Sequence, residues 1–118
     1  MNHFDVLAEF EKEFKRLFKK YKTLDDDFEK FKKILITAPT GVGKNFVILH
    51  STETTKIVKA RMACRALRDR SLRIIYAYFE QNQKIGFIEI YFKGEKENED
   101  RERIKEYLKN KNSTHHQI

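Results

Sequence analysis

The chain has 118 residues and a mass of 14.2 kDa, which suits a single domain. Its ten Phe and five Tyr exclude a disordered chain, and no segment approaches the roughly 20 apolar residues of a membrane span. Cys64 is the one cysteine, which excludes a disulfide framework within the chain. Since the N-terminus shows no signal-peptide pattern, we expect cytoplasmic localisation and no membrane partner.

The charge balance is strongly basic. Lys and Arg total 25 against 18 Asp and Glu, giving a net charge of +7 and a pI near 9.5. Such a surface favours phosphate-rich partners, because neutralising phosphates releases condensed counterions. The same charge also suits an acidic protein partner, or serves only to keep a small protein soluble. Charge alone leaves these three alternatives open.

The N-terminal third of the chain predicts a strand and two helices. Alternation over Phe4 to Ala8 indicates a short first strand. Two apolar stripes of helical period follow, separated by charged residues that mark the solvent side. The stripes consist of Phe10, Phe14, Leu17, Phe18 and Tyr21, and of Leu24, Phe28, Phe31 and Leu35. Pro39 and the glycines at 41 and 43 end the second helix. Two helices joined by so short a connection predict an antiparallel hairpin.

From Asn45 onward the hydrophobic period changes to two. A short apolar segment spans 46–50, and three longer strands are predicted over 57–66, 72–80 and 85–93. A charged break over 94–100 precedes a last amphipathic helix. The fold class expected is therefore α+β, with an N-terminal helical hairpin packed on a small antiparallel sheet and a C-terminal helix. We expect a single domain over 1–109 and a flexible polar tail over 110–118.

Residues 34–44 resemble a phosphate-binding loop, with glycines at 41 and 43 and Lys44 for the terminal phosphates. The position of the usual Mg²⁺-binding hydroxyl holds Asn45 instead. A phosphate loop follows a strand and opens a helix, whereas here the preceding segment has helical spacing and the following one does not. A nucleotide-binding fragment is thus the weaker alternative. We predict that this loop turns the chain from the second helix into the sheet, and we expect no cofactor.

Strand alternation predicts two unlike faces of the sheet. One face is apolar and suits the helical hairpin; it includes Val58, Ala60, Ile74 and Ile88. The other face is basic, and opposed like charges destabilise a sheet, so we interpret it as a surface for an anionic partner. The residues of the basic face and its adjoining turn are Lys59, Arg61, Arg65, Arg68, Arg70, Arg73, Glu89, Tyr91 and Lys93. Phe79 and Phe87 are predicted on this same face, partly covered by the last helix. The solvated face of an antiparallel sheet is the alternative.

The order of these segments resembles the RelE/ParE superfamily of toxins from bacterial type II toxin–antitoxin systems. The similar segments are residues 4–21, Lys59–Arg61, Ser71–Tyr76 and Phe87–Lys93, the last resembling the family's HigB-like branch. Order and spacing agree from about residue 3 to 109. The resemblance implies a small α+β toxin that a cognate antitoxin neutralises.

Most relatives in that superfamily cut messenger RNA on the ribosome without a metal ion, so the resemblance implies ribosome and mRNA as partners and no metal site. By motif position it implies catalytic roles for Arg73, Arg61, Lys93 and Tyr91, with Tyr91 suited to stacking on a base. The remaining basic residues, Lys59, Arg65, Arg68 and Arg70, are predicted to bind RNA phosphates.

One feature departs from the family pattern. No His lies at the end of the last strand, so a familiar general acid or base is missing, and Lys93 or Glu89 would need a shifted pKa to replace it. The ParE branch, which inhibits DNA gyrase without nuclease activity, therefore stays open as an alternative function. A toxin that has lost its activity is a further alternative.

Overall fold

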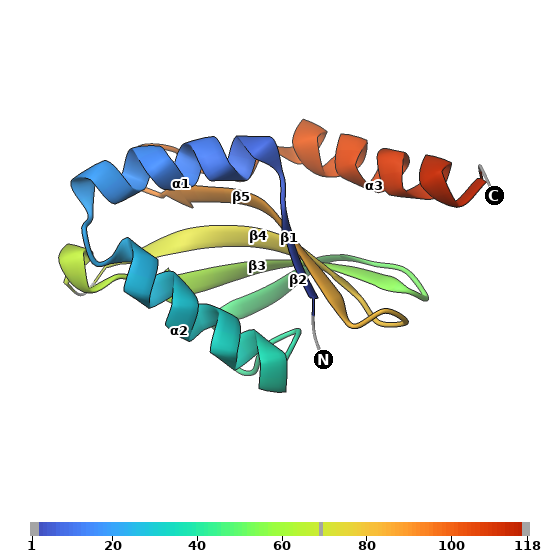
Figure 1. Ribbon diagram of the computed structural model, residues 1–118, viewed down its shortest axis with the longest axis horizontal. Coiled ribbons are helices and arrows are strands. Elements are labelled where there is room, and N and C mark those ends of the chain that lie inside the picture. The colour runs from blue at the N-terminus through green and yellow to red at the C-terminus, as the bar shows by residue number, and fades with distance from the viewer. Residues whose placement is uncertain (1–2, 69, 117–118) are drawn as a thin grey trace.

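The computed structural model describes the backbone of residues 3–68 and 70–116, and side chains over 4–68 and 70–110. The chain runs from blue to red in Figure 1. Its elements are β1 (His3–Val6), α1 (Ala8–Lys20), α2 (Leu24–Thr37), β2 (Phe46–Ser51), β3 (Thr55–Ala63), a short 3-10 turn (Arg65–Leu67), β4 (Ser71–Phe79), β5 (Lys84–Phe92) and α3 (Arg101–His116). The tail predicted over 110–118 is thus helical as far as His116, and 117 and 118 lie outside the described residues.

The five strands form one sheet in the order β1-β5-β4-β3-β2. The pairs β2–β3, β3–β4 and β4–β5 are antiparallel, but β1 pairs in parallel with β5. The α+β class is confirmed, with the correction that the sheet is mixed. Period-two alternation carries no information about the direction of a neighbouring strand, so it could not reveal the parallel pair.

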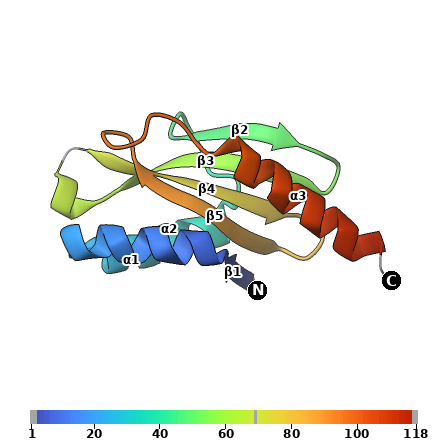
Figure 2. The same ribbon diagram turned by 90° about the horizontal axis from the view of Figure 1, so that it is seen from above.

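The helical hairpin α1–α2 covers one face of the sheet, and α3 lies on the other (Figure 2). Acidic residues in the first turn of each hairpin helix complement the positive end of the helix dipole. The apolar stripes face the sheet: Phe10, Leu17, Leu24 and Leu35 are almost fully buried there. Among the described residues, no helix is long and apolar enough to cross a membrane.

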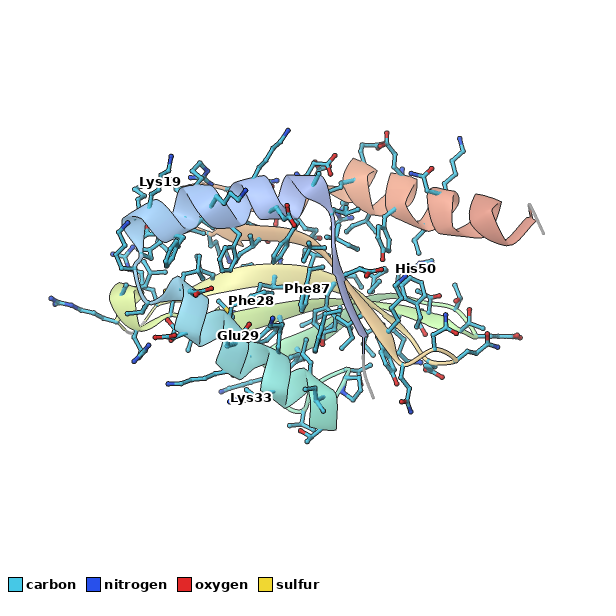
Figure 3. The ribbon with its side chains drawn as sticks, in the orientation of Figure 1. Lys19, Phe28, Glu29, Lys33, His50 and Phe87 are labelled. Atoms are coloured by element: carbon cyan, nitrogen blue, oxygen red, sulfur yellow. The ribbon has the colours of Figure 1, made fainter. Side chains whose placement is uncertain are left out.

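Phe87 lies at the centre of the core beneath the hairpin. Its ring contacts those of Phe4, Phe10, Phe28 and Tyr76, with centroid distances of 4.9 to 6.1 Å. Figure 3 shows Phe28 and Phe87 in the layer between α2 and the sheet. Such aromatic packing ties β5 to the first strand and both hairpin helices, since the large rings bury extensive apolar area.

The position of Phe87 corrects the strand-face prediction, which placed it on the basic face. In the β4–β5 pairing, Ile75 pairs with Glu89 but the next residue, Tyr76, pairs with Phe87. Ile88 is therefore an extra residue, a β-bulge that breaks the alternation. As a result Phe87 joins the hairpin core, whereas Ile88 packs on the α3 side. The prediction for Phe79 is confirmed, because its ring lies 6.2 Å from that of Tyr107 in α3.

We expect Phe87→Ala to lower the free energy of unfolding by about 3–5 kcal/mol, because the substitution leaves a cavity within a fully buried cluster. Urea denaturation followed by circular dichroism measures the loss. Phe79→Ala is the matched control, since this Phe is half-buried and should cost less. Equal losses for the two variants would contradict the assignment of Phe87 to the central core.

Candidate functional site

Three neighbouring strands place polar side chains in one row across the α3 side of the sheet. Arg61 of β3 pairs directly with Arg73 of β4, and Arg73 pairs with Tyr91 of β5. Lys59 lies two residues before Arg61 and so projects from the same face. The residues of β5 that follow the bulge at Ile88 keep the predicted alternation. Glu89 and Tyr91 therefore project from this face, as the sequence predicted for both.

A pocket of about 330 Å³ lies on this side of the sheet. Four of the predicted site residues line it: Lys59, Arg61, Arg73 and Lys93. Its other lining residues are Lys44, Asn45, Val47, Leu49, Asn98, Glu99 and Arg101. Of the described residues in this lining, Glu99 is the one carboxylate against six cationic side chains. The pocket therefore suits an anionic ligand.

The Arg61–Arg73 pair concentrates positive charge at the cost of stability. Burial lowers the pKa of Arg73, and repulsion by Arg61 lowers it further. The Arg73 guanidinium is held by Ser71, to which it donates hydrogen bonds at 2.9 Å (Oγ) and 3.3 Å (carbonyl oxygen). Its orientation is thus fixed before any ligand arrives, which is the property that electrostatic binding of a phosphate requires.

Lys59 and Glu99 form a partly buried ion pair at the pocket wall, with 2.9 Å between Nζ and Oε1. Burial acts to lower the pKa of Lys59, but the interactions with Glu99 and Tyr91 together outweigh it, and the pKa lies above its ordinary value. Burial likewise acts to raise the pKa of Glu99, yet the hydrogen bond from Lys59, a backbone hydrogen bond and the charges of Lys59 and Arg101 together hold it below its ordinary value. Both groups are charged at neutral pH.

Tyr91 lies beside this pair, and its ring is only 2% exposed. Burial raises the pKa of its hydroxyl, against the opposing effect of Lys59. Lys96 Nζ lies 5.7 Å from the ring centroid. A ring enclosed in this way cannot stack on a nucleobase, which corrects the role in base stacking expected from the sequence.

Glu89, a proposed general base, is fully buried and already engaged. It accepts hydrogen bonds from Lys96 Nζ and, at 2.8 Å, from the backbone N–H of Asp100. These contacts hold the segment between β5 and α3 against the sheet, which is how Glu99 reaches the pocket. Glu89 therefore has a structural role, and it is absent from the pocket lining.

The remaining basic residues predicted to bind RNA lie elsewhere. Arg65 forms a salt bridge with Asp27 of α2, at 3.0 Å between Nε and Oδ1. Arg70 covers the ring of Phe92, with its guanidinium carbon 5.6 Å from the ring centroid. Neither these two nor Arg68 lines the pocket. Alternation extended the basic face as far as Arg65. However, β3 ends at Ala63, so the chain leaves the sheet before Arg65.

The glycine-containing loop follows α2 and leads into β2, the reverse of a phosphate loop's context. As predicted, it turns the chain into the sheet. It is anchored by the Tyr76 hydroxyl, which donates to the carbonyl of Pro39 at 2.8 Å. Gly41 has φ of 73° and lies against the Phe46 ring, so a side chain there would collide. The loop delivers Lys44 to the pocket.

Sequence reasoning missed Lys44, Glu99 and Arg101 as pocket residues. The glycines and lysine of the loop drew attention to Lys44. However, they suggested nucleotide binding by the loop alone rather than a pocket that the loop forms together with the sheet. Glu99 and Arg101 belong to a charged segment whose composition is typical of a solvent-exposed loop. The hydrogen bond from the Asp100 N–H to Glu89 holds this segment over the sheet. No group of three or more His, Cys, Asp or Glu that could hold a metal ion occurs in the described part of the chain.

No protein-family model matches the chain, and no curated protein matches its sequence. Among solved structures, it is similar to the archaeal RelE–RelB complex from Pyrococcus horikoshii OT3, with a TM-score of 0.60 and 21% sequence identity. The alignment covers 79% of this chain and 96% of that chain. The chain therefore has the RelE-like fold that the sequence predicted, while its place in the HigB-like branch stays a prediction.

We expect Arg61→Gln to raise the free energy of unfolding by about 0.2–1 kcal/mol at low ionic strength, because it removes a like charge opposed to Arg73. The gain should shrink in high salt, which screens the repulsion. Urea denaturation at two salt concentrations measures both effects. Lys56→Gln is the control, since Lys56 pairs with Glu80 and its loss should bring no gain. A salt-independent loss of stability in Arg61→Gln would contradict the repulsion.

Glu99→Gln should lower stability mainly above the ordinary Glu pKa of 4.5. The folded-state pKa of Glu99 is depressed, so its contribution is complete above that value and is lost as the pH falls through the folded pKa. Urea denaturation from about pH 3 to 7 measures the free energy of unfolding of both proteins. The difference between wild type and variant should become smaller as the pH falls. Glu102→Gln, an exposed control, should show no such narrowing. A pH-independent difference for Glu99→Gln would contradict the ion-pair account.

Proposed function

We propose that the chain is the toxin of a type II toxin–antitoxin system and that it cleaves messenger RNA at the cationic pocket. The observation that carries this proposal is the convergence of Lys59, Arg61, Arg73 and Lys93 on one pocket of a RelE-like fold. A fold that opposes two arginines and buries part of one sacrifices stability for charge, which is typical of a site that binds a phosphate.

In the proposed reaction the RNA supplies its own nucleophile. The 2′-oxygen forms a bond to the adjacent phosphorus, the bond from phosphorus to the 5′-oxygen breaks, and a 2′,3′-cyclic phosphate and a 5′-hydroxyl remain. Arg61 and Arg73 donate hydrogen bonds to the non-bridging oxygens as negative charge develops. Glu99, kept ionised by Lys59, accepts the 2′-hydroxyl proton, and Lys93 donates a proton to the departing 5′-oxygen. The reaction needs no metal ion.

Charge also suits the proposed partners. A net charge of +7 complements the phosphates of mRNA and of the ribosome, and equally an acidic antitoxin. The similar archaeal RelE was solved in complex with RelB, which supports an antitoxin as the protein partner. A protein that works on the ribosome acts in the cytoplasm, in line with the localisation expected from the sequence.

ParE-like inhibition of DNA gyrase is the second candidate. The observation that favours it is the absence of a histidine among the described residues of the pocket lining, which leaves proton transfer to Glu99 and Lys93. His50 borders a different depression, formed with α3, and Figure 3 shows it toward the far end of the molecule from Lys19. Mapping of cellular RNA ends separates the two functions, since a gyrase inhibitor damages DNA without cutting mRNA.

Induced expression of the chain should arrest growth and produce mRNA fragments with cyclic phosphate ends. Arg73→Ala and Lys93→Ala should each slow cleavage about 10²–10³-fold, because each removes a group that stabilises or protonates the transition state. Quantitative mapping of RNA ends with purified ribosomes measures the rates. Lys33→Ala is the matched control, since Lys33 is exposed on the outer side of α2 (Figure 3) and should leave cleavage unchanged. Full activity of Arg73→Ala would contradict the proposed site.

A further inference from the structure

The edge strand β2 presents apolar side chains beside the cations of the pocket. Val47 is 52% exposed and Leu49 is 37% exposed, and both line the pocket. Val47 pairs directly with Lys59 in the β2–β3 ladder, so the two side chains lie next to each other on one face. Exposed aliphatic groups beside concentrated positive charge indicate a ligand that is partly apolar and partly anionic.

The neighbouring residue provides an internal comparison. Ile48 is 48% exposed, about as much as Val47, but it pairs with Val58, whose side chain belongs to the core beneath the hairpin. It therefore projects from the opposite face and is absent from the pocket lining. A register shift between Ile48 and His50 leaves Leu49 as the extra residue of β2, and Leu49 reaches the pocket on the same side as Val47.

A nucleobase bound near the arginines needs an apolar surface, and Tyr91 does not offer one. Its ring is buried, with Lys96 above it, and its hydroxyl interacts with Lys59 and Glu99. Of the described residues that line the pocket, Val47 and Leu49 are the apolar ones. They offer the surface on which the flat face of a base can pack.

Lys44 completes this end of the pocket with a charge. The contact between Tyr76 and Pro39 and the packing of Phe46 over Gly41 hold the loop that carries it. Lys44 forms no salt bridge among the described residues, so its ammonium group is available to a ligand phosphate. It lies on the loop immediately before β2 and thus adjoins the exposed aliphatic pair.

We propose that β2 and the loop before it form a nucleotide subsite for single-stranded RNA. Val47 and Leu49 pack against the base of a nucleotide next to the cleaved phosphate, and Lys44 binds that nucleotide's own phosphate. This subsite rests on the proposed function, because it assumes that the arginines bind the neighbouring phosphate. An edge strand also suits a protein strand, but six cations against one carboxylate in the lining favour a nucleic acid.

Fluorescence anisotropy with a short single-stranded RNA tests the subsite. The double variant Val47→Ser with Leu49→Ser should bind about five-fold more weakly, because it removes apolar contact with the base. Ile48→Ser, equally exposed on the opposite face, should bind as wild type does. Lys44→Ala should reduce the slope of log affinity against log salt by about 0.7, the loss of one phosphate contact, while the serine variants keep the wild-type slope. Melting temperatures confirm that each variant is folded.

An RNA with one abasic nucleotide provides the complementary change. Placed at the subsite, the abasic nucleotide should weaken binding to wild type and abolish the difference between wild type and the double serine variant. An unchanged affinity of the double variant, or an equal loss in Ile48→Ser, would overturn the subsite. Retained RNA binding together with lost binding to an antitoxin would assign β2 to protein docking instead.

The proposed function and the subsite fail in different ways. If wild type binds no RNA and Arg73→Ala leaves mRNA cleavage on purified ribosomes unchanged, the proposed function is wrong. If wild type binds RNA in a manner that depends on Arg73, but the β2 and Lys44 variants bind equally well with the same salt slope, only the subsite is wrong.

Discussion

The β-bulge at Ile88 determines how the two sides of this molecule are divided. Before the bulge, Phe87 points into the hairpin core; after it, Tyr91 packs in the buried cluster on the α3 side of the sheet. The irregular backbone there is satisfied by side chains: Arg103 of α3 donates to the Ile88 carbonyl at 2.9 Å, and Glu13 of α1 accepts from the Ile90 N–H at 3.2 Å. Arg103 and Glu13 also form a salt bridge, so one ionic contact joins both helical layers to the sheet at the point where its alternation changes.

The pocket depends on that junction for its shape and on opposing electrostatic effects for its charge. Arg103 attaches the start of α3, while Glu89 holds the preceding segment, and together they position Glu99 over the sheet. Glu99 neutralises Lys59, but Arg61 and Arg73 remain opposed without a carboxylate between them. Ion pairing thus stabilises the wall of the pocket, while the uncompensated guanidinium groups form the part that would meet a phosphate.

Sequence periodicity predicted the α+β layers, the hairpin and the members of the pocket that lie on regular strands. Lys59, Arg61 and Arg73 followed directly from alternation, because β3 and β4 are regular through those positions. Phe87 was misplaced because a bulge changes parity without a distinctive residue to mark it. Arg65 lies outside the sheet because β3 ends two residues earlier, at Ala63. Lys44 and Glu99 reach the pocket through tertiary contacts of loops, which no periodic pattern encodes.

The parallel pairing of β1 with β5 has a consequence for synthesis of the chain. Residues 3–6 pair with residues 84–87, so β1 cannot pair until β5, the last of the five strands, has been made. The hairpin is complete by Thr37, yet the rings that cover it, with Phe87 at their centre, emerge only after most of the chain has been translated. Such long-range pairing delays folding and leaves apolar helix faces exposed on the nascent chain. Formation of the cationic pocket is consequently a late event, since four of its lining residues follow β5.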